Sequence, residues 1–549
     1  MSENNKKNGF LMQAGILAAA SIICRIIGLL YRSPLTAIIG EEGNGYYSFA
    51  INIYTIVLLI SSYSIPSAIS KVIAQKLAIK EYRNAQRLFH CAIIYVIVVG
   101  GVGSLVAFFG APLFVMGNSI PVLRVFAPTI FVYGLLGVLR GYFQAHKTML
   151  QTSISQILEQ ILNAVVSMGA AYLLIQMVID KDESTRAMYG AMGSALGTGA
   201  GVLIALIFMW AIYMMNRKTI RRRVEHDKTP IEDSYGEVFK TIMLVVTPFI
   251  LSTFIYNIPT SLNQTLYMKV MVTGKGMGEV AISGIYGAFS LMVGISNIPI
   301  ALSSAMSSAI VPTVATTYAQ GKVKQTKNKI AAAIKVTMLI SIPAAVGIGA
   351  LAWGVVYVLY PSYGDMAEAP KMLMGLAITI IFYALSTLTN AVLQGIGKVN
   401  TPVIHAAVSL VIQTAIVFPL LKFTDFGINA LVIAMVAYSF MMCILNAAAI
   451  KKALNYKQEM DKTFIRPLFC AAIMGAVAWG IYEGISYLFK LWLEGVYLIN
   501  LISLIFAVGI AIILYFILII KLKAVNEEEL KGLPKGAAIL RMAKKMRLL

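Results

Sequence analysis

Two arginines, Arg25 and Arg32, lie in the first long apolar segment of this chain. Seven residues separate them, so on a helix their side chains fall within about 20° of each other, two turns apart on one face. A guanidinium group matches a phosphate or diphosphate with a planar fork of N–H donors. Because an ionisable residue inside a membrane span normally faces protein or a water-filled cavity, we predict that the pair binds a phosphate-bearing ligand. Alternatively, Arg32 anchors the helix at the outer interface and Arg25 caps a carbonyl of a neighbouring helix.

A second group of polar residues, Asn257, Asn263 and Gln264, lies in an apolar segment around Pro259. A proline interrupts the helical hydrogen-bond ladder, which is tolerated inside a membrane where protein or water satisfies the freed carbonyls. We predict that the three amides contact sugar or peptide groups of a ligand, with helix–helix hydrogen bonding as the alternative. Lys335 would add a cation to the ligand site, or extend its ammonium group to the inner interface.

Two carboxylates are candidates for ion binding or gating, Glu41 and Glu159. Glu41 and Glu42 stand in the first predicted outer loop, where a solvated turn is the simpler interpretation. Glu159 would lie two turns into a span, where it binds a proton or Na⁺ or pairs with Arg140 or Lys147. We favour the ion pair.

Other chemistry finds no support in the sequence. The net charge of +21 is carried mostly by short segments between apolar runs, which argues against nucleic-acid binding. The four cysteines form no CxxC pair and are predicted to be packing residues rather than metal ligands. No Walker motif and no catalytic arrangement around the four histidines is recognisable, so we expect a protein that is not an enzyme and needs no cofactor.

The elements that must position these residues are membrane-spanning helices. Hydrophobic residues make up 59% of the chain and charged residues only 13%, about half of what a soluble domain needs. The apolar residues come in runs of about 20, the length of a helix that crosses the hydrocarbon core. We predict an all-α polytopic membrane protein with fourteen spans: 10–32, 46–69, 89–115, 120–143, 152–178, 189–215, 240–268, 281–316, 330–359, 370–395, 401–421, 426–450, 464–489 and 496–520.

The distribution of basic residues predicts the orientation. The segments on one side of the spans hold 34 Lys and Arg residues and those on the other side hold 7. The positive-inside rule therefore places both termini in the cytoplasm. The spans divide into a first lobe (1–215), a cytoplasmic linker (216–239), a second lobe (240–450), two further helices (451–522) and an amphipathic tail on the inner leaflet (523–549).

An internal repeat indicates how the lobes are related. Tyr133 and Gln144 of the fourth span match Tyr383 and Gln394 of the tenth at an offset of 250. The segments PSAIS and SSAIV, which close the second helix of each half, match at an offset of 241. Because six spans is an even number, the two copies would have the same orientation. Two six-helix lobes around a central V-shaped cavity are the architecture that allows alternating access.

Several motifs resemble the multidrug/oligosaccharidyl-lipid/polysaccharide (MOP) exporter superfamily. They are CRIIGLLYRSPLTAIIGEEGNGYYSFAINIY from Cys24, SIPSAISKVIAQ from Ser64, LRGYFQAHKTMLQTSISQILEQ from Leu139 and SSAIVPT from Ser307. Within the superfamily the chain is similar to the branch of stage V sporulation protein B and the Gram-positive lipid II flippases. The resemblance implies transport of a lipid-linked cell-wall precursor to the outer leaflet of a Gram-positive cell membrane, with helices 13 and 14 forming a groove for the lipid tail.

The resemblance also has limits. Gram-negative lipid II flippases carry further arginines on the second and eighth helices and an acidic residue at the start of the second. In this chain apolar or small residues stand there, near Leu58, Gly294 and Tyr46, so those contacts are not carried over.

The expected mechanism is alternating access with an anionic lipid-linked glycan as substrate, membrane lipids around it and cell-wall synthesis enzymes as candidate partners. An inside-negative membrane potential favours outward movement of an anion, and coupling to H⁺ or Na⁺ is the alternative energy source. Three other functions stay open: export of teichoic-acid or capsular lipid-linked glycans, cation-coupled multidrug extrusion, and a non-transporting scaffold.

Overall fold

The computed structural model describes residues 3–63, 65–146, 148–227, 233–364, 367–491 and 495–525. Within these ranges every regular element is helical, as the sequence predicts. The chain forms two compact units, Met1–Ala288 and Phe289–Leu549, which divide inside α9 (Glu279–Ala319). The lobe ranges inferred from the repeat stay a prediction, and the predicted tail lies outside the described residues from position 526 onward.

The first unit contains eight helices before α9. They are α1 (Glu3–Leu58), α2 (Ile65–Ala78), α3 (Tyr82–Phe109), α4 (Ala111–Phe114), α5 (Ser119–Ala145), α6 (Met149–Met177), α7 (Glu183–Glu225) and α8 (Tyr235–Lys269), with π-helical turns η1 (Leu59–Tyr63) and η2 (Val270–Gly274).

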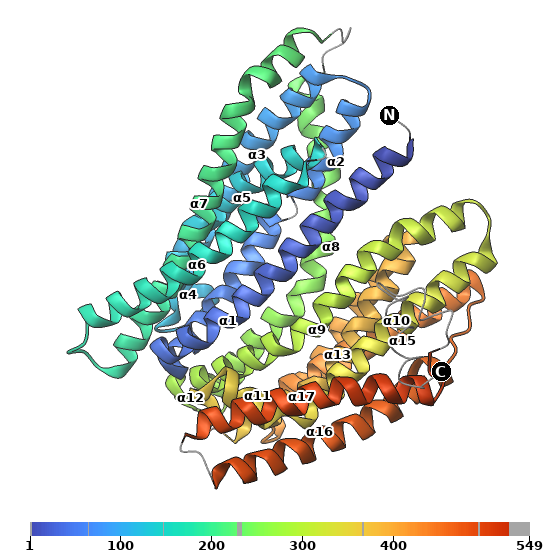
Figure 1. Ribbon diagram of the computed structural model, residues 1–549. Coiled ribbons are helices and arrows are strands. Elements are labelled where there is room, and N and C mark those ends of the chain that lie inside the picture. The colour runs from blue at the N-terminus through green and yellow to red at the C-terminus, as the bar shows by residue number, and fades with distance from the viewer. Residues whose placement is uncertain are drawn as a thin grey trace. The chain divides into compact units, whose positions relative to one another are not determined.

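The second unit contains the remaining helices. They are α10 (Val323–Ala350), α11 (Ala352–Leu359), α12 (Pro361–Gly364), α13 (Glu368–Gly395), α14 (Asn400–Phe423), α15 (Asn429–Leu454), α16 (Arg466–Lys490) and α17 (Val496–Lys521), with the π-helical turn η3 (Asp461–Ile465) (Figure 1).

The membrane spans follow from these helices. In the described part of the chain, 12 helices are long and apolar enough to cross a membrane. One of them combines two predicted spans, because α1 contains a backbone break at Gly40. Counting both halves of α1 separately gives thirteen, and the 35-residue α8 covers the predicted span 240–268, so the exact count of fourteen stays a prediction.

The prediction of an outer loop between the first two spans is wrong. Residues 33–45 were expected to be a loop, and the structure instead continues the helix on both sides of Gly40. Gly40 has φ 70° and ψ −179°, a conformation that a residue without a Cβ adopts readily. Glu41 and Glu42 therefore begin the second half of α1 rather than occupying a solvated turn.

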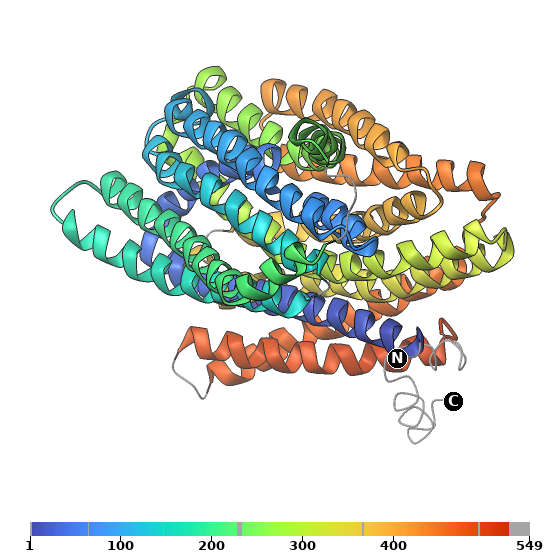
Figure 2. The same cartoon turned by 90° about the horizontal axis from the view of Figure 1, so that it is seen from above.

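Small residues set the packing of α6 against α7, which lie side by side in both views (Figures 1 and 2). Gly193, Gly197 and Gly201 recur at every fourth position of α7 and so share one face. A Cβ at Gly197 would lie 2.0 Å from the Ser167 hydroxyl oxygen. Interfaces of this kind are typical of membrane helices, because close backbone approach replaces hydrophobic burial as the source of association.

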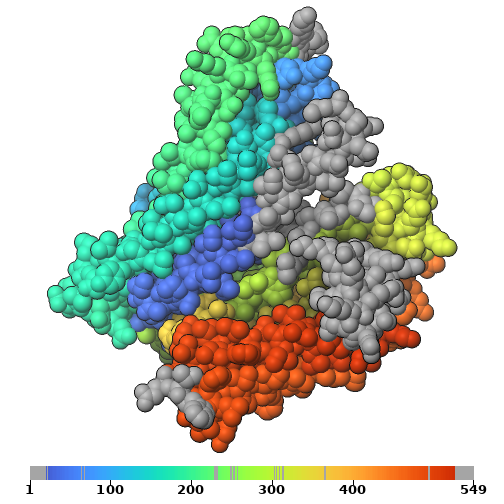
Figure 3. Space-filling model, viewed as in Figure 1, coloured from blue at the N-terminus to red at the C-terminus, as the bar shows by residue number. Residues whose placement is uncertain are grey.

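The second unit packs α10 and α13 around a buried apolar core. α16 and α17 form an adjacent pair, coloured orange-red in Figure 3. The Tyr515 hydroxyl donates to the Leu339 carbonyl oxygen at 3.1 Å and so joins α17 to α10. The Tyr482 hydroxyl donates to Asn500 Oδ1 at 2.5 Å and joins α16 to α17. These bonds place the thirteenth and fourteenth spans beside the ninth.

The two halves repeat the same helices in the same order. α3 and α10 each have 28 residues and begin at Tyr82 and Val323, an offset of 241. α5 and α13 end at Ala145 and Gly395, an offset of 250. The packing repeats as well, since α3 contacts α5 as α10 contacts α13, and α6 contacts α7 as α14 contacts α15. Both offsets equal those found in the sequence.

The predicted linker is partly helical and is held against the first unit. Residues 216–225 continue α7, and Asp227 and Asp233 then contact the ends of α2 and α3. Asp227 Oδ2 accepts from the Arg83 backbone N–H at 2.6 Å. Lys76 Nζ lies 2.6 Å from Asp233 Oδ2 and 2.8 Å from Glu81 Oε2, so one ammonium group joins the linker to the α2–α3 turn.

This ionic cluster predicts a pH dependence of stability. Hydrogen bonds from Asn84 and Lys76 lower the pKa of the Glu81 carboxyl group. A lowered folded-state pKa stabilises the protein above the unfolded-state value, about 4.3, and this contribution is lost as the pH falls through the folded pKa. We expect Glu81→Gln to lower the thermal unfolding midpoint at pH 7 and to differ less from the parent as the pH falls below about 4. A difference that stays constant with pH would contradict this role.

Candidate substrate site

The arginine pair lies on one face of α1. Ile23, Ile26 and Leu30 are 44%, 52% and 62% exposed and mark the opposite face by their helical spacing. Arg25 is exposed and forms no hydrogen bond or ion pair with the part of the chain that the structure describes. None of its five N–H donors is therefore engaged by the residues that the structure describes.

Arg32 is half-buried and held in place. Its Nη2 donates to Asn44 Oδ1 at 3.4 Å, and its guanidinium carbon lies 5.1 Å from the centre of the Tyr47 ring. Asn44 Nδ2 in turn donates to the Gly287 carbonyl oxygen at 2.9 Å. A chain of contacts thus connects the first half of α1, the second half of α1 and the start of α9.

Close backbone approach defines the contact between α1 and α9. A Cβ at Gly45 would lie 2.1 Å from the Ser283 carbonyl oxygen, and one at Gly287 would lie 2.9 Å from the Gly45 nitrogen. Both distances are shorter than any real Cβ contact, so a larger residue requires the backbones to separate. On the predicted topology this contact lies at the outer end of the helices.

Gln264 belongs to a hydrogen-bonded group between α1, α8 and α9. Its Oε1 accepts from Asn52 Nδ2 at 2.6 Å and from the Tyr286 hydroxyl at 3.2 Å, and its Nε2 donates to the Phe49 carbonyl oxygen at 3.0 Å. Every hydrogen-bonding function of this amide except one N–H is therefore engaged by the protein. This is the helix–helix alternative that the sequence left open, and substrate binding by Gln264 stays a prediction.

The other predicted polar residues are placed differently. Asn257 is exposed on α8, Asn263 is only 4% exposed, and Lys335 on α10 is 6% exposed; each has an interaction within the protein. Lys335 belongs to the second unit, whereas the two asparagines belong to the first. Glu41 is half-buried on the second half of α1. It lies near α9, since a Cβ added at Gly284 would be 3.9 Å from the Cβ of Glu41.

Glu159 forms the ion pair that the sequence suggested. Its Oε2 lies 2.8 Å from Arg140 Nη2, and Arg140 Nε donates to the Ser155 hydroxyl at 2.9 Å. Arg140 is only 5% exposed, so the positive charge of its guanidinium group is compensated by the Glu159 carboxylate rather than by water. The pair joins α5 to α6, and a separate ion-binding role of Glu159 stays a prediction.

Sequence reasoning missed Asn44, Asn52 and Tyr286. The two asparagines lie eight residues apart on the second half of α1, two turns along one face, and this spacing was the available signal. Their partners on α8 and α9 are more than 200 residues away in the sequence. A local pattern contains no information about such contacts.

A comparison with protein families decides the assignment. The model of the family "Lipid II flippase MurJ" matches residues 83–503, well over half of the 549-residue chain. The chain belongs to the lipid II flippase MurJ family. Proteins of the MurJ family are flippases for a lipid-linked precursor, and the protein is accordingly a multi-pass membrane protein of a transporter family.

Two curated relatives come from Bacillus subtilis (strain 168). Lipid II flippase MurJ is 24% identical over 501 residues, which cover 86% of this chain and 89% of the relative. Stage V sporulation protein B is 24% identical over 540 residues, which cover 96% of this chain and 98% of the relative. Both names match the branch of the MOP superfamily that the motifs indicate.

Two solved structures share the fold. Lipid II flippase MurJ in an inward closed conformation has a TM-score of 0.63 at 13% identity, covering 91% of this chain and 97% of that chain. An inward-facing multidrug resistance MATE family transporter of the MOP superfamily has a TM-score of 0.63 at 17% identity, covering 78% of this chain and 96% of that chain. At these identities the likeness concerns the fold alone.

Proposed function

We propose that this protein moves lipid II, an undecaprenyl-pyrophosphate-linked peptidoglycan unit, from the inner to the outer leaflet by alternating access. The observation that carries the proposal is the pair Arg25 and Arg32 on one face of α1, opposite that helix's exposed apolar face. A pyrophosphate has several oxygen atoms that accept hydrogen bonds, and it matches two guanidinium groups in both charge and number of acceptors.

The two arginines have different parts in this proposal. Arg25 is exposed and supplies most of the free N–H donors. Arg32 is oriented by Asn44 and Tyr47, which limits its motion and lowers the entropy lost when a ligand binds. We propose that Asn257, Asn263 and Gln264 of the first unit, and Lys335 of the second unit, contact the substrate headgroup.

The energy source that we propose is the membrane potential. With cytoplasmic termini, as the basic segments predict, the lipid-linked pyrophosphate moves outward and is driven by an inside-negative potential. The gain is about 2.3 kcal/mol per charge per 100 mV. Glu159 is neutralised by Arg140, which favours this source over an ion-coupled cycle at that carboxylate. Glu41 is the remaining candidate for H⁺ or Na⁺ binding.

The proposal is tested by rescue of a bacterial strain depleted of its own lipid II flippase. We expect the parent to rescue growth and Arg25→Ala to fail at equal membrane abundance, with Arg25→Lys intermediate because an ammonium group lacks the planar fork. Arg124→Ala is the matched control, since Arg124 is another arginine in a span but lies on α5 and contacts Phe108. Full rescue by Arg25→Ala would contradict the proposed role of the pair.

A second candidate substrate is a different lipid-linked glycan, such as a teichoic-acid or capsular precursor. Its support is the match to stage V sporulation protein B over 96% of this chain. Failure of the parent to rescue the depleted strain, together with loss of another surface glycan or of spore cortex on gene deletion, would favour this substrate class. Drug extrusion without rescue would favour a multidrug transporter instead.

A further inference from the structure

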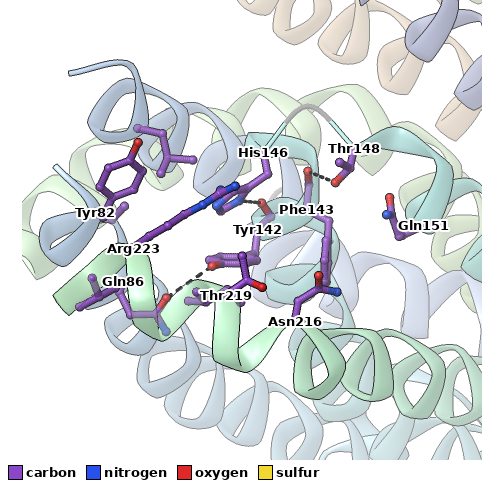
Figure 4. A pocket seen from close by; sticks show the side chains of 14 residues that line it. Tyr82, Gln86, Tyr142, Phe143, His146, Thr148, Gln151, Asn216, Thr219 and Arg223 are labelled. Atoms are coloured by element: carbon purple, nitrogen blue, oxygen red, sulfur yellow. Dashed lines mark hydrogen bonds between the residues drawn. The ribbon is translucent and has the colours of Figure 1, made fainter. Parts of the chain in front are cut away.

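A pocket of about 250 Å³ lies within the first unit, at the end of the helices that carries the basic segments (Figure 4). It is lined by the ends of α2 and α5, the beginnings of α3 and α6 and the extension of α7 beyond its predicted span. It does not include any residue of the candidate substrate site. The residues that bear on its chemistry are Tyr82, Tyr142, His146, Gln151, Asn216 and Arg223.

The pocket has a positive electrostatic character. Arg223 extends from α7 so that its guanidinium group lies beside the His146 ring (Figure 4). Within the described residues Arg223 forms no ion pair or hydrogen bond, and no aspartate or glutamate lines the pocket. A guanidinium group without a counter-ion beside an imidazole favours an anion that neutralises it.

A second feature is a polar atom that the protein does not satisfy. Gln151 Oε1 is buried and has no hydrogen-bond partner within the described residues, although Gln151 lines the pocket. A buried amide oxygen without a donor is unfavourable by about 1–3 kcal/mol. Because this oxygen is buried, a ligand hydroxyl can donate to it only after the Gln151 side chain turns toward the pocket. Asn216 and Thr219 add further polar groups to the wall.

The volume limits the ligand. The pocket volume of about 250 Å³ is smaller than the roughly 300–1,000 Å³ typical of sites for drug-sized molecules. A phosphate group esterified to a small polyol is a ligand of suitable size.

We propose that this pocket binds a phosphate ester of a small polyol, with the phosphate on Arg223 and His146 and a hydroxyl group on Gln151. The ligand is either the headgroup of an anionic glycerophospholipid or a soluble polyol phosphate. The length of α7 makes both sources accessible. Its 43 residues extend about 64 Å, twice the thickness of the hydrocarbon core, so Arg223 lies beyond the membrane-spanning part.

Protonation of His146 adds a testable linkage. Its Nδ1 lies 2.9 Å from the Tyr142 carbonyl oxygen, which leaves Nε2 for a second proton. Burial lowers the pKa of His146, and the nearby Arg223 lowers it further, against the opposite effect of the Tyr142 hydrogen bond. Among the described residues that line the pocket, the other titratable groups are the hydroxyls of Tyr82 and Tyr142, which stay neutral below pH 8.

An anion at this position favours the imidazolium form and so raises the pKa of His146 again. Between the pKa of His146 in the free protein and its pKa in the complex, His146 is protonated in the complex and neutral in the free protein. Affinity therefore increases as the pH falls from about 8 toward 5 and stops increasing once the free protein is also protonated. A phosphodiester is the suitable ligand for this measurement, because its own charge does not change in this range.

The test uses the full chain in nanodiscs of phosphatidylcholine. Binding of soluble glycerol phosphate is measured by calorimetry, and binding of phosphatidylglycerol by the rise in unfolding midpoint as it replaces phosphatidylcholine. We expect one of the two to bind, and Arg223→Gln to weaken binding about tenfold or more, as expected for loss of a charge-assisted contact. Gln151→Leu should weaken binding of the same ligand.

The matched control is Arg222→Gln. Arg222 is the neighbour of Arg223 on α7, is exposed as Arg223 is, and carries the same charge, but it does not line the pocket. Binding only of glycerol phosphate assigns a soluble ligand, and binding only of phosphatidylglycerol assigns a lipid headgroup. Equal effects of the two arginine substitutions, or no binding of either ligand, would overturn the proposal. His146→Gln should abolish the increase in affinity at low pH, and an unchanged pH profile would refute the protonation step.

Discussion

Replacing Glu159 by alanine is expected to destabilise the folded protein by about 3–5 kcal/mol, the usual effect of removing one partner of a buried ion pair. The substitution leaves the Arg140 guanidinium group, only 5% exposed, without the carboxylate at 2.8 Å that compensates its charge. The Ser155 hydroxyl, which also contacts Arg140, accepts a single hydrogen bond and carries no charge. Unfolding of the purified protein by heat or denaturant in detergent measures the effect.

Two further variants separate charge from packing. Glu159→Gln retains an acceptor for Arg140 and should lose less stability than Glu159→Ala. The double variant Arg140→Met/Glu159→Leu removes both charges and should recover most of the loss, because a hydrophobic pair of similar volume needs no compensation. If the double variant were as unstable as the sum of the single variants, the two side chains would not act as a pair.

Replacing Gly45 by alanine is expected to abolish transport. The added Cβ would lie 2.1 Å from the Ser283 carbonyl oxygen, and because that atom belongs to the backbone it cannot rotate away. The contact between α1 and α9 must therefore open, and the Asn44 bond to the Gly287 carbonyl at 2.9 Å is lost with it. Under alternating access, a protein that cannot close this end cannot complete its cycle. Rescue of the depleted strain provides the measurement.

The matched control lies on α6, away from the arginine face. Gly169 has no atom within 4 Å of the position that a Cβ would occupy, so Gly169→Ala should fold and transport like the parent. An alanine is also a better helix former than glycine, which excludes a general loss of helicity as the cause in either variant. Full rescue by Gly45→Ala would show that the α1–α9 contact is not part of the transport cycle.

The sequence was sufficient for the membrane helices and their order. Long apolar runs and the one-sided distribution of Lys and Arg determine where helices cross a bilayer, and both signals are local. The repeat could also be found, because Tyr133 and Tyr383 retain a common offset. The prediction of the first outer loop was wrong because it also relied on a local pattern. A run of two glutamates and two glycines resembles a turn, although Gly40 alone provides the break and helix continues on both sides.

The contacts between distant segments could not be predicted. Asn52 meets Gln264 across 212 positions, and nothing in either segment identifies the partner. The pocket was missed for the same reason, because His146 follows the fourth predicted span and Arg223 lies in the predicted linker, and the two approach only because α7 continues into that linker. By contrast, the common face of Arg25 and Arg32 could be predicted from the sequence, since helical geometry alone places residues seven apart on one face.

Translocation of lipid II in liposomes that contain only the purified protein tests the central claim most directly. Lipid II with a labelled headgroup is placed in the inner leaflet, and its appearance in the outer leaflet is followed with an impermeant quencher. The account predicts rapid translocation by the parent and a rate near that of empty liposomes for the Arg25→Ala/Arg32→Ala variant. Translocation by the double variant at the parent rate, or none by the parent at any membrane potential, would contradict it.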